Sequence, residues 1–118
     1  MSPARISAKA SRKAPAVRRP VRGSRTGRPI MVVLDLLGRR AALRVLWELR
    51  SDTLTFRALQ EAAQTNPSLL NTRLKELREA GLIEHDGGYR LSTRGRTMLA
   101  ALQPLYEWSE RWGKEMGG

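Results

Sequence analysis

Polar side chains with hydrogen-bonding chemistry are concentrated in one short stretch of the sequence. Asn71 carries an amide that donates and accepts at once, as a bidentate contact with adenine in the major groove of DNA requires. Ser68 and Thr72 carry hydroxyls that can bond base edges or phosphates, and Arg73 and Lys75 carry cations that can pair with phosphates. Any solvated surface helix also has a polar face, so these residues alone leave DNA contact and plain solvation both open.

The rest of the sequence lacks the residues of common catalytic and metal centres. It has no cysteine and one histidine, His85, which excludes a thiolate metal site, a disulfide framework and a nitrogen-rich metal cluster. It has no Gly-rich phosphate loop followed by Lys and Ser or Thr, and no carboxylate pair beside an expected cleft. We therefore expect no enzymatic activity, no metal and no cofactor, and we interpret His85 as an ordinary strand residue.

Positive charge is distributed unevenly along the chain. Its 118 residues include 22 Lys and Arg against 11 Asp and Glu, a net charge of +11. Nine of the basic residues and no acidic residue lie in residues 1–28, so residues 29–118 carry 13 minus 11, or +2. Residues 1–28 also contain almost no large apolar side chain. This composition predicts a disordered basic N-terminal arm, 1–28, followed by one folded domain, 29–118.

We expect neither a membrane span nor a cleaved targeting peptide. The longest apolar run, residues 30–37, is interrupted by Asp35 and is much shorter than the roughly 20 residues of a membrane-spanning helix. The N-terminus is Arg-rich, but its prolines break the amphipathic helix that a transit peptide needs. The prediction is a soluble, cytoplasmic protein.

Apolar side chains recur at helical intervals in five segments. The expected helices cover residues 29–37, a segment from beyond Gly38 to near Ser51-Asp52, and residues 56–63 and 67–80, with a last helix from residue 93 onward. Thr55 and Thr93 are expected N-caps, and Thr65-Asn66-Pro67 supplies the turn, the cap and the first-turn proline of the fourth helix. Gly81 is expected to stop that helix, and Pro104 to kink the last one.

Two short alternating runs, residues 82–85 and 89–92, are joined by Asp86-Gly87-Gly88, whose glycines suit a tight hairpin turn. Residues 53–55 include two β-branched threonines, so we expect them to pair as a very short strand. A helix, a short helix, a turn and a capped helix, followed by a hairpin, is the order of a winged helix-turn-helix. The expected fold class is therefore mainly α with a small β-wing, and the helix at 67–80 is expected to enter the major groove.

The sequence resembles the HxlR-type regulators over about residues 31–112. The strongest stretch runs from Pro67 to Ile83, where a serine near the helix start, a Leu-x-x-x-Leu-x-x-Leu stripe and a Gly-Leu-Ile exit coincide. The other stretches are Leu37-Gly38-Arg39-Arg40, Leu43, Leu46, Leu49, Phe56-Arg57-Ala58-Leu59 and Tyr89-Arg90-Leu91-Ser92-Thr93-Arg94-Gly95-Arg96. The resemblance implies a dimeric bacterial repressor or activator, with dimer contacts from the first and last helices. Sensing through a cysteine, known in some members, does not carry over because this chain has none.

Together these observations assign roles to individual residues. Base readout is assigned to Ser68, Asn71 and Thr72. Phosphate contacts are assigned to Arg57, Arg73, Lys75, Arg90 and Arg94. The dimer interface is assigned to Val33, Leu34 and Leu37 because the resemblance implies contacts from the first helix. It is also assigned to Leu102, Leu105, Trp108 and Trp112, because the apolar stripe of the last helix is wider than one small domain needs. A pocket for an unknown small-molecule effector is the alternative for the two tryptophans.

The function expected from the sequence is sequence-specific binding of double-stranded DNA by a homodimeric transcriptional regulator, at half-sites about one helical turn apart. The basic arm is expected to add nonspecific affinity by releasing counterions, and Arg25-Thr26-Gly27-Arg28-Pro29 is similar to the Gly-Arg-Pro core of minor-groove AT-hooks. Two alternatives stay open. One is a nucleoid-associated architectural protein without base preference, and the other is a protein-interaction module whose tail binds RNA or acidic protein.

Overall fold

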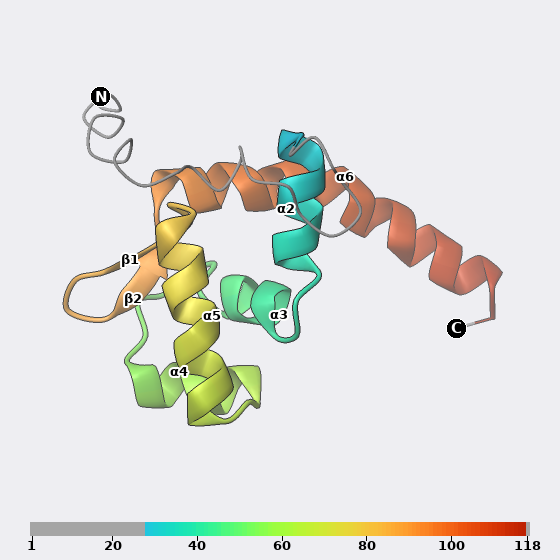
Figure 1. Cartoon of the computed structure of the whole chain (residues 1–118). Coiled ribbons are helices and arrows are strands. Elements are labelled where there is room, and N and C mark those ends of the chain that lie inside the picture. The colour runs from blue at the N-terminus through green and yellow to red at the C-terminus, as the bar shows by residue number, and fades with distance from the viewer. Residues whose placement is uncertain (1–27, 118) are drawn as a thin grey trace. The chain divides into compact units, whose positions relative to one another are not determined.

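The computed structural model of the chain describes residues 28–117, which hold helices α2 to α6 and strands β1 and β2 (Figure 1). The chain divides into two compact units, residues 1–43 and 44–118, and each is described by itself. The arm expected at residues 1–28 lies outside the described residues except for Arg28. Helices and strands follow one another in the order that the sequence predicts.

Helix α2, Pro29–Leu37, belongs to the first unit and has the ends predicted from the sequence. Pro29 occupies the first helical turn, where the missing N–H removes no hydrogen bond. Gly38 caps the other end through its backbone N–H. An ion pair of 2.8 Å between Asp35 and Arg39 spans that end, so local contacts close the helix on both sides.

Helix α3, Ala42–Glu48, is shorter than the predicted segment, which runs from beyond Gly38 to near Ser51-Asp52. Residues 38–41 form turns instead, and Ala41 has a left-handed backbone with a φ of 72°. A residue with a Cβ rarely adopts this conformation, and it ends the helical run of the backbone. The predicted start was wrong because apolar spacing carries no information about one unusual backbone angle.

Helices α4, Phe56–Ala63, and α5, Pro67–Glu79, both begin at side-chain caps. Thr55 accepts a backbone N–H of α4 at 3.1 Å, and Asn66 accepts one of α5 at 2.8 Å. These bonds satisfy N–H groups that have no partner within the helix. Gln64, with a φ of 55°, ends α4 in the left-handed conformation, so the chain turns directly into α5.

The C-terminal end of α5 is a Schellman motif centred on Gly81. Gly81 has a φ of 78° and donates its N–H to the Arg78 carbonyl at 2.9 Å. Leu82 donates its N–H to the Leu77 carbonyl, also at 2.9 Å. The positive φ favours glycine, and the two bonds satisfy carbonyls at the end of the helix. The stop predicted at Gly81 is therefore confirmed.

Strands β1, Ile83–His85, and β2, Tyr89–Leu91, form an antiparallel hairpin. Gly87 and Gly88 at its tip have φ values of 70° and 135°, as a tight turn requires. Gly88 also has no room for a side chain, because a Cβ there would lie 2.7 Å from the Thr53 methyl carbon. The glycines that predicted the hairpin are needed for its backbone and for its packing.

A single bridge extends the hairpin by one residue. Leu54 exchanges two backbone hydrogen bonds with Tyr89, of 2.9 and 2.8 Å. The very short strand expected at residues 53–55 is therefore present as one bridging residue. Within the hairpin, Ile83 lies opposite Leu91 and both are buried. One face of the small sheet therefore belongs to the core.

Helix α6, Thr93–Glu115, begins at the residue that was predicted to be its N-cap. Ser92 is the N-cap, because its hydroxyl accepts the N–H of Gly95 at 3.0 Å. The prediction that Thr93 caps this helix was wrong, since both residue types can cap and only the backbone path chooses between them. Pro104 lies inside α6, which continues through it as one helix.

The core of residues 44–118 is built from α3, α4, α5 and the hairpin. Its buried apolar side chains are Val45, Leu46, Leu49, Leu59, Ala63, Leu70, Leu74, Leu77, Ile83, Tyr89 and Leu91. Helix α5 packs on β1, and α6 packs on β2. A helix, a turn and a capped helix followed by a hairpin form a winged helix-turn-helix, as predicted.

Candidate nucleic-acid interface

Helix α5 divides cleanly into a buried face and an exposed polar face. Leu70, Leu74 and Leu77 point into the core and are at most 2% exposed. The other face carries four exposed polar side chains at i, i+3, i+4 and i+7, so they lie together on one side of the helix. They are Ser68, Asn71, Thr72 and Lys75. The structure thus brings all three predicted base-reading residues onto one surface with a cation.

These polar side chains differ in how much of their hydrogen-bonding capacity is already used. The Thr72 hydroxyl donates to the Ser68 carbonyl at 3.2 Å, so its oxygen remains as an acceptor. Among residues 28–117, the Asn71 amide and the Lys75 ammonium make no hydrogen bond or ion pair. Asn71 therefore has the full donor and acceptor pair that adenine recognition needs.

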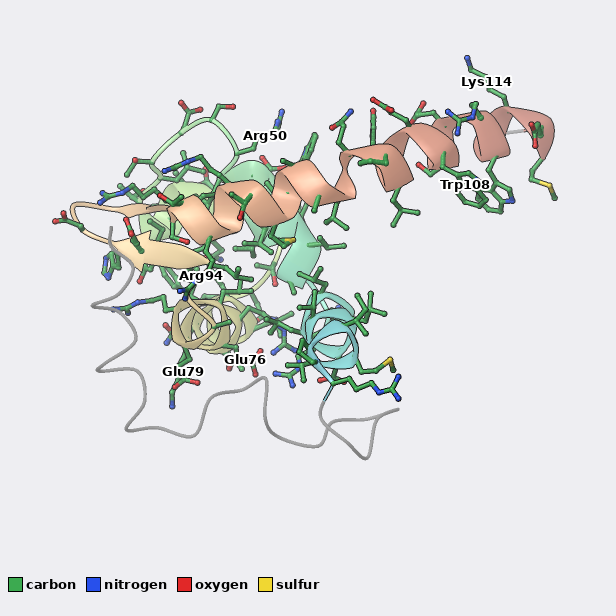
Figure 2. All side chains as sticks on the ribbon, turned by 90° about the horizontal axis from the view of Figure 1, so that it is seen from above. Arg50, Glu76, Glu79, Arg94, Trp108 and Lys114 are labelled. Atoms are coloured by element: carbon green, nitrogen blue, oxygen red, sulfur yellow. The ribbon has the colours of Figure 1, made fainter. Side chains whose placement is uncertain are left out.

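The two halves of α5 differ in their charged groups. The helix begins at an exposed Pro67, and N–H groups of its first turn give this end a partial positive charge. The second half carries Glu76 and Glu79, which Figure 2 shows on α5 away from α6. Cations accompany both carboxylates, since Arg73 pairs with Glu76 at 2.9 Å and Arg78 lies in the last turn of the helix.

Three of the five predicted phosphate-binding cations are exposed. Arg57 lies in the first turn of α4, Lys75 lies on α5, and Arg94 lies in the first turn of α6. Arg94 also lies close to the end of α5, because a Cβ at Gly81 would be 2.7 Å from its guanidinium nitrogen. The three cations thus come from three helices, α4, α5 and α6, and exposed cations are the groups that pair with the phosphates of a duplex.

The two other predicted cations are held by carboxylates. Arg73 pairs with Glu76 at 2.9 Å, and its side chain is only 14% exposed. Arg90 bonds Glu84 across the hairpin at 3.1 Å and lies 3.8 Å from the carboxylate of Asp86. Each ion pair offsets the positive charge that was predicted to attract phosphate. Arg73 and Arg90 are consequently weaker candidates for phosphate binding than their positions in the sequence indicated.

The C-terminal part of α6 leaves large apolar side chains in solvent. Leu105 is 59% exposed, Trp108 50%, Trp112 51% and Met116 68%. The two indole rings stack nearly in parallel, with centroids 5.9 Å apart. This part of α6 extends beyond the other elements of residues 44–118, and Trp108 and Lys114 point to different sides of it (Figure 1, Figure 2). We call this exposed set the α6 apolar stripe.

The remaining residues predicted for a dimer interface differ in exposure. Leu34 of α2 is exposed, Val33 is half-buried, and Leu102 of α6 is half-buried. Leu37 is 7% exposed and has little surface left for a second chain. Burial thus leaves Leu34, Leu105, Trp108 and Trp112 as the exposed part of the predicted set, and Met116 of the stripe was not predicted.

A second aromatic group was not anticipated from the sequence. Trp47 of α3 stacks on Tyr106 of α6 with ring centroids 6.3 Å apart, and the Arg50 guanidinium lies 4.1 Å from the Trp47 ring centroid. All three side chains are exposed. The sequence holds no signal for this contact, because 59 positions separate the two rings and their pairing depends on how the helices pack.

The described part of the chain holds neither a cluster of metal ligands nor a helix able to cross a membrane. Residues 28–117 contain no group of three or more His, Cys, Asp or Glu side chains that could hold a metal ion. Over the same residues, no helix combines the length and apolarity that crossing a membrane demands.

Comparison with known proteins identifies a family and a solved structure of similar fold. Residues 36–116 match the profile of the HxlR-like helix-turn-helix family. No curated protein matches the chain significantly. Among solved structures, the quinone-bound YodB from B. subtilis has a similar fold, with a TM-score of 0.65, over 70% of this chain and 94% of that chain. The two sequences are 24% identical, so the likeness is one of fold.

Proposed function

This chain belongs to the HxlR-like helix-turn-helix family, whose members are DNA-binding regulators of transcription and not enzymes, and on that premise we propose that it reads specific duplex sites as a homodimer. A bacterial regulator that binds chromosomal DNA acts in the cytoplasm. We propose that this chain is associated with the bacterial nucleoid. Base readout by Ser68, Asn71 and Thr72 is the centre of the proposal.

The polar face of α5 is the observation that carries this proposal. Four exposed polar side chains lie at i, i+3, i+4 and i+7, while the leucines of the opposite face anchor the helix in the core. A recognition helix needs this combination, because base readout requires polar groups on a helix that does not move relative to its domain. The side-chain amide of Asn71 makes no hydrogen bond within residues 28–117, so it is available for a bidentate contact with adenine, which is specific for that base.

Phosphate contacts around this helix are proposed for Arg57, Lys75 and Arg94. They are exposed and come from three different helices, so they can hold the backbone on more than one side of the groove. Arg73 and Arg90 contribute less, because each is already paired with a carboxylate. The predicted basic arm, residues 1–28, adds counterion release, and its deletion is expected to flatten the dependence of affinity on salt.

The homodimer is proposed from the α6 apolar stripe. Its members Leu105, Trp108, Trp112 and Met116 lie on a long helix and remain half or more exposed in the single chain. A contiguous apolar surface that contains tryptophans is typical of a protein interface. A second copy brings an identical stripe, and its two-fold symmetry matches the palindromic half-sites that such domains read.

A selection from random duplex DNA at about physiological salt tests the main proposal. Recovery of a palindrome with half-sites about one helical turn apart is the expected result. Strong binding without an enriched motif would instead support an architectural protein, which the net charge of +11 also favours. Preference for RNA over duplex DNA in a competition assay would support an RNA-binding tail and overturn the proposal.

A small-molecule effector is proposed as a further ligand of the same regulator. The similar fold of YodB was solved with quinone bound, and this chain exposes a stacked Trp47 and Tyr106 beside Arg50. A quinone cannot form a thiol adduct here, because there is no cysteine. Addition of p-benzoquinone to the operator complex is expected to change affinity reversibly, with recovery after dialysis. Unchanged affinity would exclude this class of effector.

A further inference from the structure

The end of the recognition helix and the start of α6 are joined by one buried side chain. The Ser92 hydroxyl donates to the Gly81 carbonyl, just beyond α5, at 2.6 Å. The same oxygen accepts the N–H of Gly95, in the first turn of α6, at 3.0 Å. Ser92 therefore uses one hydroxyl to cap α6 and to connect it to α5, although 11 positions separate Ser92 from Gly81.

Backbone contacts around Ser92 make this junction tight. The Ser92 N–H donates to the Leu82 carbonyl at 3.0 Å. Gly95 approaches the same carbonyl so closely that a Cβ on Gly95 would overlap its oxygen. Ser92 itself is only 9% exposed. We name this junction of Gly81, Leu82, Ser92 and Gly95 the α5–α6 clamp.

We propose that Ser92 is a positioning residue that fixes the angle between the recognition helix and the dimerisation helix, and so sets the spacing of half-sites that a dimer accepts. This inference rests on the proposed homodimer and its palindromic site. In such a dimer, the partner is held by the α6 apolar stripe, while DNA is read by α5. The clamp is the place where these two helices meet within one chain.

The length of α6 makes the spacing sensitive to this junction. From Ser92 to Trp112 there are 20 residues, or about 30 Å at the helical rise. A change of roughly 10° at the clamp moves the far end of α6 by about 5 Å, more than the ~3.4 Å step between base pairs. A loosened clamp therefore lets the two recognition helices of a dimer reach more than one half-site spacing.

The test compares affinities for duplexes in which the half-site spacing is lengthened or shortened in single base pairs. Ser92→Gly is the principal variant, because glycine is a tolerated N-cap and the substitution removes the hydroxyl that reaches Gly81. Ser92→Ala removes both the cap and the link. Thr93→Ala is the matched control, since it removes an exposed hydroxyl at the neighbouring position. All variants are measured well below their unfolding midpoints.

We expect the wild-type chain and Thr93→Ala to prefer one spacing strongly. Ser92→Gly is expected to keep the half-site motif and to lower the ratio of affinities for the best and next-best spacings by roughly tenfold. An equal loss at every spacing, or no change in the ratio, would mean that Ser92 only stabilises the fold and would overturn the inference. If the wild-type chain selects no palindrome, the proposed function itself fails, and that outcome is distinct from a failure of the clamp.

Discussion

Helix α5 and the C-terminal part of α6 are both amphipathic, but only α5 has its apolar side covered within the chain. Leu70, Leu74 and Leu77 of α5 are nearly inaccessible to solvent, whereas the α6 apolar stripe is half or more exposed. The difference follows from position. Helix α5 packs against the hairpin, while the end of α6 extends past the other elements of residues 44–118 (Figure 1).

This contrast indicates where each helix acts. Helix α5 buries its leucines in its own domain, so its remaining surface is polar and is available for a polar partner such as DNA. The α6 apolar stripe has no such cover, and its burial by a second chain would remove large aromatic surfaces from water. The two proposed kinds of recognition, of DNA by α5 and of a second chain by α6, therefore correspond to what the chain itself covers on each helix.

The sharpest test of the contrast is truncation of a buried leucine in α5. Leu70→Ala is expected to lower the free energy of unfolding by about 2–5 kcal/mol, because it removes fully buried methyl groups and leaves a cavity. Urea unfolding measures this change. Leu105→Ala on α6 is the matched substitution at an exposed site, and an equal loss of stability there at low protein concentration would contradict the comparison.

Truncation of a tryptophan in the α6 apolar stripe tests whether this exposed surface forms the homodimer interface. Trp112→Ala is expected to weaken the homodimer by about 2 kcal/mol or more, roughly thirtyfold in dissociation constant. The unfolding midpoint of the monomer should change little, since the side chain is half exposed in a single chain. Sedimentation over a concentration series gives the dissociation constant, with Arg111→Ala as the control. A wild-type chain that stays monomeric throughout would refute the interface.

Substitutions on the polar face of α5 separate base readout from backbone contact. Asn71→Ala is expected to cost about 1–3 kcal/mol at the selected operator and to relax the preference at one base position. Lys75→Ala should weaken all sequences alike and reduce the salt dependence of binding. Titrations on operator and scrambled duplexes at two salt concentrations distinguish these outcomes. A uniform loss for Asn71→Ala would assign that residue to the backbone instead.

Loss of the cap of α5 has the smallest expected effect. Asn66→Ala removes the hydrogen bond of 2.8 Å at the start of the recognition helix and should destabilise the fold by about 1 kcal/mol. Thermal unfolding provides the measurement, and Glu61→Ala, at an exposed helical position of α4, serves as the control. An Asn66→Ala variant that is as stable as the wild-type chain would show that the cap does not stabilise the fold.

The sequence alone determined most of the local structure, because its signals act over a few residues. Hydrophobic spacing located α5 and its buried leucines, the caps Thr55 and Asn66 were identified by type and position, and Gly81 marked the end of the helix. The same locality explains the errors. The start of α3 depends on one left-handed residue, Ala41, which apolar spacing does not encode.

Only the tertiary structure decided which of the predicted residues are available. Arg73 and Arg90 have the same side chain as the exposed Arg57, yet ion pairs engage them. The stack of Trp47 on Tyr106 and the clamp at Ser92 join segments that are separate in the sequence. Such contacts are set by how helices pack, and packing depends on the whole chain. The sequence therefore determined the recognition helix, and the tertiary structure decided which side chains around it can take part.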